Sequence, residues 1–306
     1  MTLPNGKITF DTRLGFIGLG YMGSRIARRL AAAGFPMVVY NRRREKAAEL
    51  AELGAEVAHD PGELAREADV VLSCLADATA VEAVYLGPGN VLRSAHPGTW
   101  IIELSTVSPK TSRNLHRSAR ELGLSALDVA ISGSTPAAEA GSLTLFGGGE
   151  RKIFESAEPI FSAIAKQWFY MGPSGSGVAM KLVVNVLLGV GMQALAEAIA
   201  LGARLELPRD LLLDTLAKPA VVAPAHAGKL ATAKEGDYSP QFPIRLMRKD
   251  FGLALSAAEQ SGLSMPATEA AATINTEEAA GNREEDFSAV IRWMEETKQE
   301  HALPAA

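Results

Sequence analysis

The first half of the chain alternates short, apolar, β-branched runs with amphipathic stretches. The apolar runs RLGFIG, PMVVYN, ADVVLSCL, TWIIELST, LSALDVAIS and LTLFGGG are each followed by turn residues or by a segment with helical spacing. Strands that alternate with helices of this length form parallel βαβ units. The pattern therefore predicts an α/β fold, a doubly wound parallel sheet over residues 13–175, preceded by a short tail at residues 1–12.

The pattern changes at GPSGSG, residues 172–177, beyond which it predicts helices and no strand. The helix expected at 178–205 is apolar on nearly every face, so a second domain or a subunit partner should bury it. The uncharged run between Lys181 and Glu197 holds 15 residues, fewer than the roughly 20 that a bilayer requires. We therefore expect a separate all-α domain at 176–306 and no membrane partner.

Composition and charge narrow the classes of partner and compartment. The net charge of −5 predicts no nucleic-acid partner. Cys74, the single cysteine, is expected in a buried strand, and one cysteine is typical of a reducing compartment. The N-terminal residues lack a secretion signal, so a cytoplasmic location is expected. The histidines have no metal-ligand spacing, so no metal is predicted, and His226 is assigned to a loop.

The segment GFIGLGYMG places Gly18, Gly20 and Gly23 in GxGxxG spacing, after a strand and before a helix. The first glycine permits a tight turn, the second lets the backbone approach a pyrophosphate, and the third lets the helix pack on the strand. The helix N-terminus then presents free N–H groups to the anion. A Rossmann-type dinucleotide site is predicted, and it also includes Leu19, Tyr21 and Met22.

The end of the second predicted strand distinguishes the two nicotinamide dinucleotides. An acid there would bind the adenosine ribose and repel a 2′-phosphate, but the chain has Asn41, followed by Arg42 and Arg43. Guanidinium groups offer forked donors to a phosphate. The sequence therefore predicts NADP (NADPH) as cofactor, and Arg44 is assigned to ordinary surface charge.

Two further motifs are candidates for substrate chemistry. In LDVAISGSTPAAEAGSL, Ser134 or Thr135 can cap a helix whose first position is Pro136, which leaves N–H groups and the Ser132 hydroxyl for a carboxylate. The same residues also fit a capped loop without a ligand. In GSGVAMKLVVN, Lys181 and Asn185 are four residues apart and share a helix face, where a desolvated lysine could exchange a proton with substrate.

These motifs together resemble the β-hydroxyacid dehydrogenase family over roughly residues 13–297. GFIGLGYMGSRIARRLAAAG resembles its cofactor motif, VAISGSTPAAEAGSL its substrate motif, GPSGSGVAMKLVVN its catalytic motif and FPIRLMRKDFGLAL its late lysine-aspartate segment. The resemblance implies a Rossmann-type domain joined to an all-helical domain. It also implies a homodimer or homotetramer paired through the long helix.

The resemblance assigns roles to individual residues. Lys181 would be the catalytic acid/base and Asn185 would orient the substrate. The substrate carboxylate would bind at Ser132, Gly133 and Ser134. Leu75 and Thr106 would contact the cofactor, with Thr106 also beside the substrate, and Lys249 would reach the cofactor from the helical domain.

The expected activity is reversible hydride transfer between NADP(H) and a short carboxylate-bearing aldehyde or oxo acid. SGS in place of the family's usual SGG is similar to the glyoxylate/succinic semialdehyde reductase branch, which prefers NADPH. Arg29 replaces a usual asparagine and is interpreted as a surface change. An imine reductase-like enzyme is one alternative, although such enzymes carry an acid or tyrosine at the position of Lys181. A non-catalytic NADP-binding protein is the other, and such proteins lack the lysine.

Overall fold

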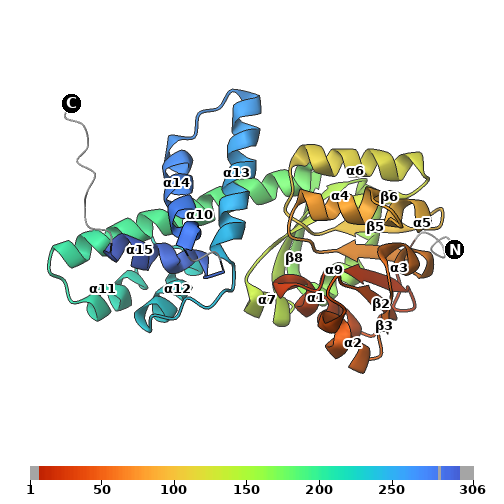
Figure 1. The fold of residues 1–306 in the computed structure, drawn as a ribbon, viewed down its shortest axis with the longest axis horizontal. Coiled ribbons are helices and arrows are strands. Elements are labelled where there is room, and N and C mark those ends of the chain that lie inside the picture. Colours follow the sequence, from red (N-terminus) through yellow and green to blue (C-terminus); the bar gives the residue numbers. More distant parts are fainter. Residues whose placement is uncertain (1–6, 282–283, 297–306) are drawn as a thin grey trace. The chain divides into compact units, whose positions relative to one another are not determined.

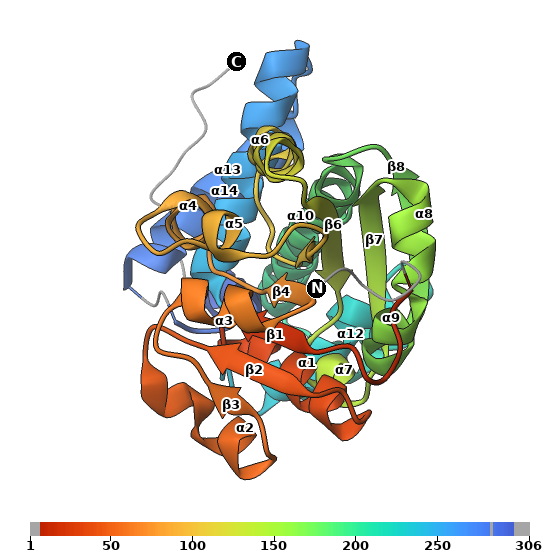
Figure 2. The same ribbon diagram turned by 90° about the vertical axis from the view of Figure 1, so that its right-hand side faces the viewer.

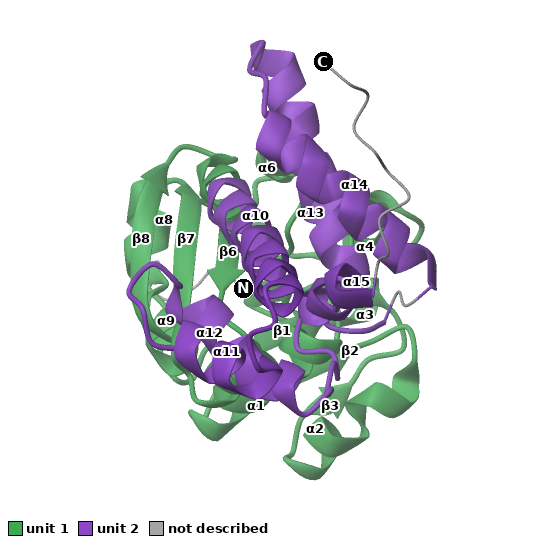
Figure 3. Cartoon of the chain, turned by 90° about the vertical axis from the view of Figure 1, so that its left-hand side faces the viewer, with its two compact units in different colours: residues 1–181 green, residues 182–306 purple. Residues whose placement is uncertain are grey.

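The computed structural model describes residues 7–281 and 284–296. The chain divides into two compact units, residues 1–181 and residues 182–306 (Figure 3). The boundary lies inside the long helix α10, Ser176–Arg204, so Lys181 belongs to the first unit and Asn185 to the second.

The first unit is built on an eight-stranded sheet with strand order β3-β2-β1-β4-β5-β6-β7-β8 (Figure 2). Its strands are β1 Leu14–Ile17, β2 Met37–Tyr40, β3 Glu56–Val57, β4 Val70–Ser73, β5 Trp100–Glu103, β6 Ser125–Ser132, β7 Leu143–Gly149 and β8 Ala165–Gly172. Chain order reverses between β1 and β4, and such a switch point is where open α/β sheets bind nucleotides.

The strands β1 to β6 are parallel, as expected, but β7 runs antiparallel to β6, and β8 is parallel to β7. The predicted doubly wound sheet is confirmed and is mostly parallel, with its last two strands running opposite to the first six. The connection from β6 to β7 spans only residues 133–142 and contains one short helix. A parallel crossover needs about a dozen residues or more, so this connection returns the chain in the opposite direction.

Helices cover both faces of the sheet (Figure 1). One apolar core is shared with α1 Tyr21–Ala32, η2 Arg44–Ala47, α2 Ala48–Glu52, α7 Thr135–Glu139, α8 Arg151–Ser156 and α9 Glu158–Ile164. The other core is shared with α3 Pro61–Glu67, α4 Ala78–Leu86, α5 Val91–Ser94 and α6 Pro109–Glu121, and with Val178 from the first turn of α10. The strands alternate between these cores because successive side chains point to opposite faces.

The described residues of the second unit form helices joined by loops, with one isolated β-bridge between Pro243 and Asp286. Beyond α10 it contains α11 Arg209–Leu216, α12 Pro224–Lys234, α13 Ile244–Ser261, α14 Pro266–Gly281, η3 Phe287–Ala289 and α15 Val290–Glu296. His226 lies in α12, where its Nε2 is 2.8 Å from the Leu188 carbonyl oxygen, so its assignment to a loop is wrong. The helix α10 is long and apolar enough to cross a membrane, a property that it shares with the core helices of soluble proteins.

Candidate cofactor and substrate site

The glycine loop after β1 has the backbone geometry that its spacing predicts. Gly18 has a φ of +96°, and a Cβ atom there would lie 2.4 Å from the Cys74 carbonyl oxygen. A Cβ atom on Gly23 would lie 1.9 Å from the Gly18 carbonyl oxygen, whereas one on Gly20 would meet nothing within 4 Å. The loop therefore packs tightly at Gly18 and Gly23 and has open space beside Gly20. Cys74 itself is half-buried and lies one residue beyond β4, so it is not a buried strand residue as expected.

The N-terminus of α1 is available to an anion. The helix begins at Tyr21, with Gly20 as its N-cap and no capping side chain. The first N–H groups of a helix have no intrahelical partner and carry the positive end of its dipole. Together with the open space beside Gly20, they fit the pyrophosphate of a dinucleotide.

Asn41 follows β2 directly, because that strand ends at Tyr40. Its Oδ1 accepts a hydrogen bond from the Leu19 N–H at 2.9 Å, and its Nδ2 donates one to the Arg43 carbonyl oxygen at 2.8 Å. A carboxylate could accept the first bond but has no hydrogen to donate for the second. The presence of an asparagine instead of an acid is therefore explained by its amide, which joins the glycine loop to the segment of residues 42–44. This segment is called the arginine turn below.

The three arginines after Asn41 differ in their contacts. Arg42 is exposed and has no side-chain hydrogen bond or ion pair with the described residues. Arg43 is exposed and reaches Glu45 only at 4.0 Å. Arg44 Nη1 lies 3.1 Å from His59 Nδ1. Arg42 and Arg43 thus have guanidinium groups open to solvent, which fits a bound phosphate.

The two loops that carry Leu75 and Thr106 are joined by a buried polar cluster. Glu103, at the end of β5, is 1% exposed. Its carboxyl group accepts hydrogen bonds from the Ser105 N–H at 2.7 Å and from the Ser73 hydroxyl. Ser105 Oγ in turn accepts the Leu75 N–H at 2.7 Å.

Burial shifts the ionisation of this cluster. It raises the pKa of Glu103 above its ordinary value, although hydrogen bonds from Ser105 and Ser73 oppose the shift. Burial also raises the pKa of Tyr85 well above its ordinary value, with the Glu103 charge as a further cause. The Tyr85 hydroxyl lies 2.6 Å from Ser73 Oγ. The sequence pattern offered no sign of this cluster, because Ser73, Tyr85 and Glu103 all sit within apolar runs.

The predicted substrate loop connects β6 to α7. Ser132 ends β6, Gly133 has a φ of +140°, and Ser134 is the N-cap of α7, although its side chain makes no capping bond. The helix begins at Thr135, so Pro136 is its second residue and not its first. The unused Ser134 side chain leaves both serine hydroxyls of this loop for a ligand.

Two arginines of α1 fix the helix that follows this loop. Arg25 Nε donates to Glu139 Oε1 of α7 at 2.6 Å. Arg29 is half-buried and donates to the Ala163 carbonyl oxygen at 3.2 Å, and a Cβ atom on Gly141 would lie 2.8 Å from its Nη2. The interpretation of Arg29 as a surface change is therefore wrong, because it joins α1 to α9 and to the end of α7.

In the second unit, Asn185 is held by Asp250, the acid of the late lysine-aspartate segment, to which the sequence assigned no role. The Asn185 Nδ2 donates to Asp250 Oδ2 at 2.5 Å, and Lys249 Nζ lies 3.2 Å from Asp250 Oδ1. Asn185 Oδ1 is buried without a hydrogen-bond partner among the described residues. That oxygen fits an acceptor position for a substrate hydroxyl. The adjacent pair Lys249 and Asp250 was the only sequence signal for this contact.

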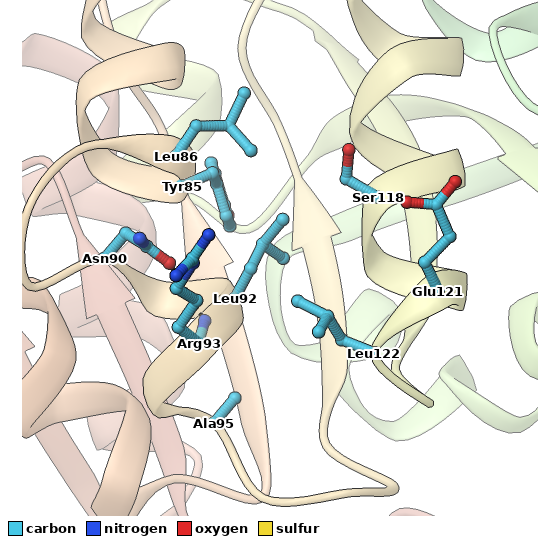
Figure 4. A pocket seen from close by; sticks show the side chains of 9 residues that line it. All are labelled: Tyr85, Leu86, Asn90, Leu92, Arg93, Ala95, Ser118, Glu121 and Leu122. Atoms are coloured by element: carbon cyan, nitrogen blue, oxygen red, sulfur yellow. Dashed lines mark hydrogen bonds between the residues drawn. The ribbon is translucent and has the colours of Figure 1, made fainter.

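A shallow depression of about 480 Å³ lies elsewhere on the first unit. Figure 4 shows it between α4, α5 and α6, with Arg93 and Glu121 among its side chains. None of its lining residues belongs to the predicted site. Among the described residues, no group of three or more His, Cys, Asp or Glu side chains could hold a metal ion.

Comparison with known proteins decides the family. Residues 13–172 match the NAD-binding domain of 6-phosphogluconate dehydrogenase, and residues 175–294 match the NAD-binding domain of NADP-dependent 3-hydroxyisobutyrate dehydrogenase. The chain belongs to the 3-hydroxyisobutyrate dehydrogenase family. This protein is accordingly an NAD(P)-dependent hydroxyacid dehydrogenase that acts on a CH–OH group.

Three relatives illustrate the range of this family. Glyoxylate/succinic semialdehyde reductase 1 of Arabidopsis thaliana is 34% identical over 91% of this chain and 96% of its own length. The NAD-dependent L-serine dehydrogenase of Pseudomonas aeruginosa is 35% identical over 94% and 99%. The structure of Mycobacterium tuberculosis 3-hydroxyisobutyrate dehydrogenase with L-serine superposes with a TM-score of 0.84, at 31% identity over 93% of this chain and 99% of that one.

Proposed function

We propose that this dehydrogenase uses NADP(H) and interconverts a short carboxylate-bearing aldehyde or oxo acid with its hydroxyacid, mainly in the direction of reduction. The exposed, unengaged Arg42 guanidinium beside a neutral Asn41 carries the cofactor proposal. The NAD-dependent serine dehydrogenase among the relatives makes NAD the competing cofactor. The semialdehyde reductase from Arabidopsis supports the proposed substrate class.

The chain's own residues divide the chemistry among them. Hydroxyl and N–H groups of the predicted substrate loop, at Ser132, Gly133 and Ser134, hold the substrate carboxylate. Lys181 exchanges a proton with the substrate oxygen. Asn185, fixed by Asp250, accepts a hydrogen bond from the substrate and orients it. The bound nicotinamide supplies or accepts the hydride. Fixing the reacting atoms in register contributes several kcal/mol to the rate enhancement.

Lys181 is the residue whose loss should stop turnover. We expect Lys181→Ala to lower kcat by about 100-fold or more, since general acid catalysis contributes about 10²- to 10⁴-fold. NADPH binding, measured by fluorescence titration, should change little. The measurement is loss of NADPH absorbance with glyoxylate and succinic semialdehyde.

Lys166→Ala is the matched control, because Lys166 is an exposed lysine of the same unit, on β8. The control should keep wild-type kcat. Wild-type turnover in Lys181→Ala would refute the acid/base role. Reduction of a cyclic imine alone would favour the imine reductase alternative, and NADPH binding without any turnover would favour a non-catalytic protein.

The proposed cellular setting is a cytoplasmic homodimer or homotetramer that binds neither nucleic acid nor membrane. The net charge of −5 and the single cysteine support this setting. The apolar side chains that α10 exposes, Val183, Leu187 and Leu201, fit burial against a second copy of the chain.

A further inference from the structure

The start of the helix that carries Lys181 is held by a buried carboxylate from the sheet. Asp128 lies in the middle of β6 and is 0% exposed. Its Oδ1 accepts the Gly175 N–H at 2.8 Å, and its Oδ2 accepts the Val178 N–H at 3.0 Å. Gly175 directly precedes α10 and Val178 lies in its first turn. Asp128 therefore caps α10 from 47 residues away in the sequence.

Glycines leave the room for this contact. A Cβ atom on Gly148, the β7 partner of Asp128, would lie 2.7 Å from Asp128 Oδ1. A Cβ atom on Gly177 would lie 2.3 Å from the Phe146 carbonyl oxygen and 2.5 Å from the Asp128 carbonyl oxygen. Gly175 has a φ of +88°, which favours glycine. The first turn of α10 thus packs directly on the backbones of β6 and β7.

The same strand ends at the predicted substrate loop. Ser132 lies four residues after Asp128 on β6, and Lys181 lies three residues after Val178 on α10. Residues three apart share a helix face. All of these residues belong to the first compact unit. The strand β6 therefore contacts the first turn of α10 through Asp128 and carries the substrate loop at its end.

We propose that Asp128 is a positioning residue, which fixes the first turn of α10 and thereby holds Lys181 in register with Ser132. This inference rests on the proposed role of Lys181. The two hydrogen bonds engage an anion at the positive end of a helix dipole, where a carboxylate is favoured. A neutral amide at the same place would turn an NH₂ group toward one of the two N–H donors.

The test is Asp128→Asn, measured at a temperature at which the variant is folded. We expect kcat to fall roughly 10- to 100-fold, as for a small displacement of a catalytic group, while the Kd for NADPH stays within about twofold. The primary isotope effect with 4-deuterated NADPH should rise, because hydride transfer becomes rate-limiting.

Val129→Ala is the matched control, since Val129 is the buried neighbour on β6 whose side chain lies in the opposite apolar core. It should lower the melting temperature but keep wild-type kcat and isotope effect. Wild-type kcat in folded Asp128→Asn would overturn the proposal and leave Asp128 a role in stability alone. Lys181→Ala, assayed beside it, separates the two claims, because its retained turnover would refute the proposed function instead.

Hydrogen exchange on the wild-type protein provides a test if Asp128→Asn does not fold. The Gly175 and Val178 amides should exchange as slowly as amides in the centre of β6, because both are buried donors to Asp128. Exchange of these amides at the rates of a mobile loop would overturn the proposal.

Discussion

At the residue scale, three buried acids position elements of the candidate site. Asp128 contacts the start of α10, Glu103 joins the loops of Leu75 and Thr106, and Asp250 holds Asn185. The sequence predicted the glycine loop because GxGxxG is read from adjacent residues. It could not predict these contacts of the three acids, because the partners lie 47, 30 and 65 residues away.

Glu103 gives a pH-dependent prediction. Its folded-state pKa is raised by burial, so the native protein keeps a proton that the unfolded chain releases above about pH 4.5. The stability that this group contributes is fully present below that pH and is lost as the pH rises through the raised folded pKa. We expect Glu103→Gln, which is neutral at every pH, to remove this decline.

The measurement is the melting temperature of wild type and Glu103→Gln between pH 4 and pH 8. The wild type should lose stability relative to the variant as the pH rises. A difference that stays constant with pH would contradict the shifted ionisation of Glu103. Glu121→Gln is a suitable control, because this glutamate is exposed at the end of α6.

At the element scale, the short segment after β2 determines the cofactor preference that we propose. Its position after the second strand was predictable from the alternation of strands and helices. The sequence did not reveal that Asn41 binds the backbone at both ends of its amide. Likewise, apolar alternation located β7 but not its direction, because direction depends on the length of the connection between strands.

The arginine turn provides the prediction at this scale. Replacing Arg42 and Arg43 by Ala should raise the KM for NADPH by about tenfold or more, since a hydrogen bond to a charged group contributes about 1.5–3 kcal/mol and about 1.4 kcal/mol is a factor of ten. The KM for NADH should change much less. Steady-state kinetics with both cofactors measures the effect.

Arg44→Ala is the control for that pair, because Arg44 contacts His59. It should leave the preference for NADPH nearly unchanged. An equal rise in the KM for NADPH and the KM for NADH in the double variant would show that the arginines support the fold and do not recognise a phosphate.

At the scale of the whole molecule, the sequence predicted an α/β unit followed by helices because the period of its apolar pattern changes near residue 175. Packing within one chain buries only part of the apolar surface of α10. Its buried residues Met192, Ala196 and Ile199 pack in the helical core, while Val183 and Leu187 are 57% and 70% exposed. An exposed apolar face of this kind is typical of a subunit interface.

We therefore predict that the protein sediments as a dimer or tetramer at micromolar concentration. Leu187→Glu should shift it toward monomer, because a charge would be buried without a partner. Leu53→Glu, at an equally apolar but separate exposed site at the end of α2, should not. A monomeric wild type in analytical ultracentrifugation would refute the assembly.

The central claim, an NADPH-dependent reductase of carboxylate-bearing aldehydes, is tested most directly by one ratio. It is the kcat/KM for NADPH divided by that for NADH, measured with glyoxylate and succinic semialdehyde at saturating concentration. The account predicts a ratio of about ten or more, since Arg42 and Arg43 would bind the 2′-phosphate. A ratio near or below one would contradict it.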